Sequence, residues 1–227
     1  MSRHISEQYD TELENARRRL MEMGGLVERQ LQDAAQALVT HDAELASYVV
    51  DGDERVNQLE VDLDDSCVHI IARRQPAASD LRLLVSIMRA STDLERAGDE
   101  AQRIAKMALN VSDLKYPEDQ YGEIKQLSEL VIQMVSDALD AFARLDVEGA
   151  KRTIEADHQV DDAYGNICQT LSDRMREHPD QVKHALNTLW SARALERIAD
   201  HAKNIAEYVI FQVEGEDIRH AHQELDS

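Results

Sequence analysis

The chain has 227 residues, enough for one large domain or two domains of about a hundred residues each. Its 45 acidic residues against 25 Lys and Arg give a formal net charge of −20, which disfavours binding to nucleic-acid phosphates or anionic membrane surfaces. Aromatic residues make up only 4% of the chain, whereas helix-favouring residues such as Ala, Leu, Glu and Arg are abundant. We therefore expect an all-helical protein, and the apolar content of 43% is sufficient for a folded core.

Short polar breaks divide the chain into six expected helices. The segment "LVTHDAEL" separates helices 6–40 and 43–75, and "RRQPAASD", with Pro76, precedes helix 79–111. After "DLKYPEDQYG", with Pro117, come helices 119–145 and 148–177, separated by "RLDVEGAK". The last break, "REHPDQ", with Pro179, precedes helix 181–213. Proline excludes its predecessor from the helical region, and Asp42 and Asp146 are suited to cap the helices that follow them.

Each half is expected to form one three-helix bundle, because long helices joined by short turns run antiparallel. The first bundle spans residues 1–115, and the second spans 116–227 with a polar C-terminal tail. No N-terminal stretch is apolar enough for a signal sequence, and no apolar run approaches the length needed to span a bilayer, so we expect a cytoplasmic protein without membrane insertion. Cys67 and Cys168 are expected to be buried reduced thiols.

One sequence motif occurs twice. "LERAGDEAQRIAK", residues 94–106, and "LERIADHAKNIAE", residues 195–207, are identical at seven of thirteen positions. Apolar and small residues in and before both copies recur at steps of three and four, which indicates a buried stripe on the third and sixth helices. The pairs Glu95 with Asp99 and Glu196 with Asp200 lie beside that stripe, four residues apart on one helix face.

The preceding helix of each half supplies further acids at the same height. Residues equally distant from a turn lie side by side in antiparallel helices, since each helical residue rises 1.5 Å. This places Glu95 and Asp99 near Asp53, Asn57 and Glu60, and places Glu196 and Asp200 near Asp157, Asp161 and Asp162. Each bundle is thus expected to gather four or five oxygen-bearing side chains between adjacent helices, with Gly98 and Ala199 allowing close approach.

Two interpretations of these clusters remain open. Oxygen-only clusters suit hard cations such as iron, manganese, magnesium or calcium, which would relieve the repulsion between like charges. Alternatively, the acids form interhelical salt bridges with Arg96, Arg197, Arg103 or Lys203. A catalytic di-iron site is disfavoured, because no His follows Glu95 or Glu196 by three positions. His201 is expected to be a surface residue.

The chain resembles the PhoU family of bacterial phosphate-uptake regulators. The resemblance rests on the N-terminal "ISEQYDTELENARRRLMEMGGLVERQL", the "RRQPAASDLR" turn, both L-E-R-x-x-D helices and "AFARLD". It implies two tandem three-helix bundles, often a homodimer, with metal bound by Glu95, Asp99, Glu196 and Asp200. Asp53, Asn57, Asp157 and Asp161 are the second candidates for ligands.

The resemblance also implies a function. Members of the family repress the phosphate-starvation response and are thought to link the ATPase subunit of the phosphate transporter to a sensor histidine kinase. Asp80, Arg82 and Arg144 become candidate partner-binding residues, although Asp80 is also a plausible N-cap. The alternatives are a metal-dependent enzyme that uses the carboxylate clusters and a plain helical scaffold without metal.

Overall fold

The computed structural model describes residues 2–111 and 121–216, and this part of the chain contains helices and no strand. The first half comprises α1 (Ser2–Thr40), α2 (Ala43–Gly52), α3 (Glu54–Arg74) and α4 (Ala78–Val111). The second half comprises α5 (Gly122–Arg144), α6 (Val147–Glu177), the short 3₁₀ helix η2 (Pro179–Gln181) and α7 (Val182–Glu214). The expected boundary at residues 115 and 116 lies outside the described residues.

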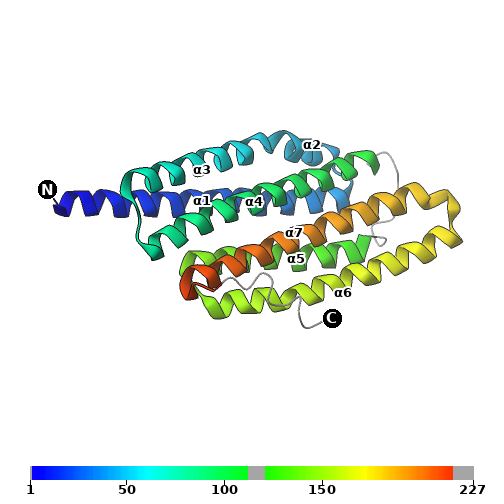
Figure 1. Ribbon diagram of the computed structural model, residues 1–227. Helices are drawn as coiled ribbons and strands as arrows, with labels where there is room; N and C mark the ends of the chain where they lie inside the picture. The colour runs from blue at the N-terminus through cyan, green and yellow to red at the C-terminus, as the bar shows by residue number, and fades with distance from the viewer. Residues whose placement is uncertain (1, 112–120, 217–227) are drawn as a thin grey trace.

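The two halves are tandem three-helix bundles that lie against each other, as Figure 1 shows. Helices α1, α4 and the α2–α3 pair form the first bundle, and α5, α6 and α7 form the second. The two motif-bearing helices, α4 and α7, run side by side through the middle of the molecule (Figure 1). The motifs of both copies therefore flank the interface between the bundles.

Local chemistry places the helix boundaries where the breaks predict them. Asp42 accepts hydrogen bonds from the backbone N–H groups of Glu44 and Leu45, both at 3.0 Å, and so caps α2. Asp146 accepts one from the backbone N–H of Gly149 at 3.0 Å and caps α6. These bonds satisfy backbone donors that a helix leaves unpaired in its first turn.

Two local expectations are wrong. The helix expected over 43–75 is interrupted at Asp53, where the chain forms a turn between α2 and α3. Asp80 does not cap a helix, because it lies inside the first turn of α4 and its carboxylate accepts a hydrogen bond from the Tyr9 hydroxyl at 2.9 Å. The contact between Tyr9 and Asp80 is a tertiary one, which local sequence patterns do not encode.

The buried stripes of the duplicated helices are confirmed. Leu84, Ile87, Leu94, Ala101 and Ala105 on α4 are all buried, as are the residues of the expected stripe on α7: Leu195, Ile198, Ala202, Ile205 and Val209. Cys67 is a buried free thiol, and Cys168 is a partly buried one. Within the described residues, no helix combines the length and apolar character needed to cross a bilayer.

Candidate metal-binding sites on the duplicated helices

The first carboxylate cluster, defined as Asp53, Glu60, Glu95 and Asp99, lies where the turn between α2 and α3 meets α4. Burial raises the pKa of Glu95, and the neighbouring carboxylates, of which Asp99 contributes most, raise it further. The pKa of Asp53 is raised by burial and then by Asp99. The acids from the two sides of the bundle therefore lie close enough to repel one another, as the turn geometry predicts.

Asp53 is the most deeply placed member of this cluster. Its exposed fraction is 5%, and its Oδ1 atom is buried without a hydrogen-bond donor among the described residues. Nearby, the Oε1 atom of Gln30 is likewise buried and unpaired. A buried acceptor without a donor destabilises the fold unless something else, such as a cation, satisfies it.

Gly98 allows this close approach between α4 and Asp53. A Cβ atom at position 98 would lie 3.4 Å from Gln30 Oε1 and 3.5 Å from Asp53 Oδ1, which is ordinary van der Waals contact. A methyl group therefore fits at this position, and the small residue places α4 directly against the two unpaired oxygens.

The second carboxylate cluster, defined as Asp157, Asp161, Glu196 and Asp200, lies between α6 and α7. The pKa of Glu196 is raised by burial and then by Asp200. Asp200 is partly exposed to solvent. Its desolvation by the surrounding protein raises its pKa, and the neighbouring carboxylate of Asp157 raises it further. The second half therefore gathers its acids in the way that the first half does.

This second cluster contains its own cations. Lys203 Nζ lies 2.5 Å from Asp157 Oδ2, and Arg193 lies 2.6 Å from Glu196 Oε1. Asp157 is nearly buried, with an exposed fraction of 4%. The salt-bridge interpretation is thus correct for Lys203.

Among the described residues, the remaining basic residues of the motifs form no ion pair with the cluster carboxylates, although the charge of Arg96 opposes the rise in the pKa of Glu95 and that of Lys106 opposes the rise in the pKa of Asp53. Arg197 and Arg103 both pair with Glu100, at 2.7 Å and 2.9 Å, rather than with the motif carboxylates. Glu100 is itself buried on α4, so its bond with Arg197 joins the two bundles. Within residues 2–111 and 121–216, Arg96 forms no ion pair.

His201 differs from its expected role, whereas the role of Asn57 as a ligand stays a prediction. The Asn57 side chain is exposed and makes no hydrogen bond within the described part of the chain. His201 is not a surface residue: its side chain is 12% exposed, and its Nδ1 atom lies 2.8 Å from Asp93 Oδ1. That histidine connects the bundles instead of joining the second cluster.

The donor chemistry of both clusters fits a hard cation. Each offers carboxylate oxygens whose mutual repulsion a bound cation would relieve, and each presents one buried oxygen without a donor, Asp53 Oδ1 in the first cluster and Glu196 Oε2 in the second. In the described residues, no three Asp, Glu, His or Cys side chains already converge as a coordination sphere. Metal binding therefore requires side-chain rotation, which partly exposed Asp99 and Asp200 can undergo.

The three candidate partner-binding residues lie in different settings. The carboxylate of Asp80 is engaged by Tyr9, and Arg82 Nε donates to the backbone oxygen of Gln212 at 3.2 Å, near the end of α7. Arg144 is exposed and pairs with Asp140 at 3.4 Å, beside a surface cleft of about 310 Å³ between α5 and α6. Of the three, Arg144 is the one whose side chain is most available to a partner.

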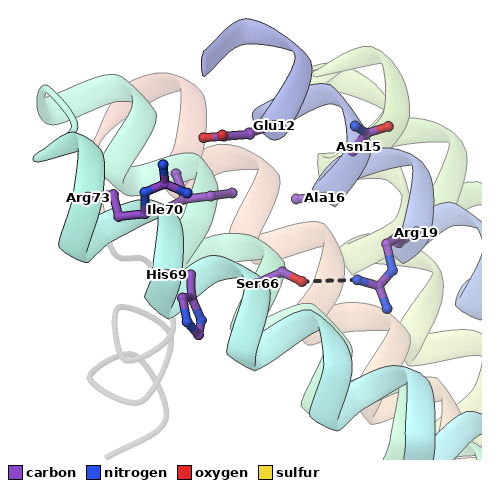
Figure 2. A pocket seen from close by; sticks show the side chains of 8 residues that line it. All are labelled: Glu12, Asn15, Ala16, Arg19, Ser66, His69, Ile70 and Arg73. Carbon is purple, nitrogen blue, oxygen red and sulfur yellow. Dashed lines mark hydrogen bonds between the residues drawn. The ribbon is translucent and has the colours of Figure 1, made fainter. Parts of the chain in front are cut away.

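A further cleft, of about 240 Å³, lies between α1 and α3, away from both carboxylate clusters (Figure 2). Arg19, from the run of arginines at 17–19, lines it and donates to Ser66 at 3.0 Å and to Asp62 at 3.1 Å. Arg74, next to the cleft, binds Glu12 through two hydrogen bonds at 2.9 Å and 2.7 Å. These pairs fix α3 against α1 and so position the helix that begins directly after Asp53.

Comparison with known proteins agrees with the duplication. The PhoU domain family matches two segments, residues 20–108 and 124–209. A "Phosphate-specific transport system accessory protein PhoU homolog" from Pseudomonas aeruginosa is 46% identical over 220 residues, covering 97% of this chain and 91% of the relative. The Escherichia coli "Phosphate-specific transport system accessory protein PhoU" is 42% identical over 227 residues, covering 100% and 94%.

Two solved structures have the same fold. The crystal structure of PhoU from Pseudomonas aeruginosa matches with a TM-score of 0.89 and 45% identity, covering 92% of this chain and 100% of that one. The phosphate transport system regulatory protein PhoU from Streptococcus pneumoniae matches with a TM-score of 0.84 and 29% identity, covering 92% and 98%. The similarity therefore extends over both bundles in sequence and in structure.

Proposed function

Because the chain belongs to the PhoU domain family, we propose that it is an accessory regulator of phosphate transport that represses the phosphate-starvation response when phosphate is plentiful. The observation that carries this proposal is similarity over the whole chain to relatives named as accessory proteins of phosphate-specific transport. The protein acts in the cytoplasm by binding, without catalysis. It functions as a homodimer.

In this proposal the protein links the ATPase subunit of the phosphate transporter to the sensor histidine kinase. The net charge of −20 supports binding to basic surfaces on these partners, and such binding weakens as salt screens the charges. Arg144 is exposed beside the α5–α6 cleft, and of the three candidate partner-binding residues its side chain is the least constrained by contacts within the protein.

Gene deletion tests the regulatory role. We expect a strain without this chain to express its phosphate-scavenging genes in phosphate-rich medium, and expect the wild-type chain to restore repression. Unchanged repression in the deletion strain would contradict the proposal. Pull-down with the purified ATPase subunit and the cytoplasmic part of the kinase, at low and high salt, tests the linking role, and capture of neither partner would exclude it.

We also propose that the carboxylate clusters bind hard cations such as iron, manganese or magnesium. When bound, the cation supplies positive charge that holds the two helices of each cluster together. Asp53, Glu95 and Asp99 provide oxygen ligands in the first bundle, and Asp157, Glu196 and Asp200 provide them in the second. Elemental analysis of the purified protein, with Glu95→Gln and Asp200→Asn as comparisons, tests this; equal metal content in all three proteins would contradict it.

A further inference from the structure

The two carboxylate clusters differ in whether they contain their own positive charge. Lys203 and Arg193 form ion pairs within the second cluster, at 2.5 Å and 2.6 Å. In the first cluster, no described Lys, Arg or His forms an ion pair with Asp53, Glu95 or Asp99. The first cluster is thus the one whose carboxylates form no ion pair among the described residues, and the charges of Arg96 and Lys106 act on Glu95 and Asp53 only from a longer distance.

Aligning the duplicated motifs traces this difference to two positions. Lys203 aligns with Gln102, whose Nε2 donates to the backbone oxygen of Val50 at 3.2 Å. Arg193 aligns with Thr92, whose hydroxyl donates to Glu60 at 3.0 Å. Neutral residues in the first copy therefore occupy the positions of both cations in the second, although the paired acids of the motif are the same in both copies.

Burial makes the Lys203 contact the more consequential of the two. The side chain of Asp157 is 6% exposed and that of Lys203 is 30% exposed, so their charges interact with little screening by water. Arg193 is 54% exposed and its pair is correspondingly weaker. A cation that binds Asp157 must displace the Lys203 ammonium group or share the carboxylate with it.

We propose that Lys203 is a built-in counter-ion that neutralises the second cluster without metal and competes there with a divalent cation. This inference rests on the proposed metal binding and assigns the two clusters different affinities. The first cluster, with Gln102 in place of Lys203, depends on an external cation and binds it more tightly. The second cluster stays held together when metal is scarce, so the two bundles respond to metal at different concentrations.

The metal-free arm of the test uses thermal unfolding of the full chain in EDTA. The variant Lys203→Gln introduces the residue that the first copy has at this position. Lys151→Gln is the matched control, because it removes the same charge from an exposed pair with Glu148 on the surface of α6. We expect Lys203→Gln to lower the melting temperature clearly and Lys151→Gln to change it little. Equal melting temperatures for Lys203→Gln and the wild type would overturn the proposal.

The second arm titrates Mn²⁺ by calorimetry, with an electron paramagnetic resonance signal for free Mn²⁺ as an independent count. We expect two classes of site in the wild type, with Glu95→Gln removing the tighter one. Lys203→Gln should tighten the weaker class about tenfold, the effect of removing one partly screened competing charge. The reciprocal change, Gln102→Lys, should weaken the tighter class.

The outcomes separate this inference from the proposed function. If the two sites bind Mn²⁺ with equal affinity both in the wild type and in Lys203→Gln, the proposed competition by Lys203 is wrong, whereas the proposed metal binding stands. Absence of Mn²⁺ binding at any site would overturn both the competition and the proposed metal binding. The regulatory role is tested separately by gene expression in the deletion strain.

Discussion

Tyr208 on α7 donates a hydrogen bond from its hydroxyl to Asp93 on α4 across 2.7 Å, and so joins the motif helices of the two bundles. The same carboxylate also bonds to His201 at 2.8 Å and to Asn204 at 3.0 Å. Asp93 is 4% exposed, so one buried carboxylate forms hydrogen bonds with three residues of the opposite bundle. A paired buried carboxylate with several donors fixes the relative position of two helices.

Replacing Asp93 should therefore loosen the interface between the bundles. We expect Asp93→Ala to lower the free energy of unfolding by about 3 kcal/mol, because three polar groups lose their acceptor. Tyr208→Phe removes a single bond and should cost about 1 kcal/mol. Denaturant unfolding measures both, with Asp140→Ala as the control, since Asp140 forms only an exposed pair. Equal losses for Asp93→Ala and Asp140→Ala would contradict this role.

Removing one acid from the first cluster should stabilise the metal-free protein. The pKa of Glu95 is raised by burial and by neighbouring carboxylates, so at neutral pH its charge opposes folding, and this opposition is relieved as pH falls toward the raised pKa. We expect Glu95→Gln to raise stability in EDTA at pH 7 by about 1 kcal/mol. The same variant should lose most of the thermal stabilisation by Mn²⁺. A destabilised variant in EDTA would show that Glu95 has a favourable role without metal.

Low pH should act on the second bundle through His184. This side chain is 1% exposed, its Nδ1 atom lies 3.2 Å from the Tyr121 hydroxyl, and burial lowers its pKa to about 4. The unfolded chain takes up a proton near the ordinary pKa of 6.5, whereas the folded chain does not, so stability falls as pH drops from 6.5 toward 4.

The contribution of His184 to this loss is at most about 3 kcal/mol. His184→Gln keeps a polar group beside Tyr121 but cannot be protonated. We expect the difference in unfolding free energy between wild type and variant to change by up to that amount between pH 6.5 and pH 4. The carboxylate clusters are present in both proteins and cancel in the comparison. Parallel pH profiles would show that His184 becomes protonated in the folded protein.

The duplicated motif predicted the carboxylate clusters because both depend on regular helix geometry. Helical rise and the position of a turn are enough to bring Asp53 near Asp99 and Asp157 near Asp200, even though the helix is interrupted at Asp53. The Asp93 contacts follow no such rule. Asp93 aligns with Ala194, so the repeat gives no second copy to compare, and its partners depend on how the bundles pack. The pairing of Arg197 with Glu100 escaped prediction for the same reason.

The final prediction separates structural from partner-binding arginines. Arg82 Nε donates to the backbone oxygen of Gln212. Gln212 lies in the last turn of α7, where carbonyl groups lack donors from within the helix. Arg82→Ala should therefore lower the free energy of unfolding by about 1 kcal/mol, with any loss of partner binding arising through the displaced end of α7. Arg144 forms only an exposed pair with Asp140, so Arg144→Ala should leave the unfolding curve unchanged.

Measuring both properties on both variants decides the assignment. If Arg144 contacts a partner, Arg144→Ala reduces capture of the ATPase subunit or of the kinase at unchanged stability, and Arg144→Lys restores part of it. The nearby Arg152, which pairs with Asp146 at 3.7 Å in the same α5–α6 cleft, provides a control of equal charge. Equal capture by wild type, Arg144→Ala and Arg152→Ala would remove this cleft from the partner surface.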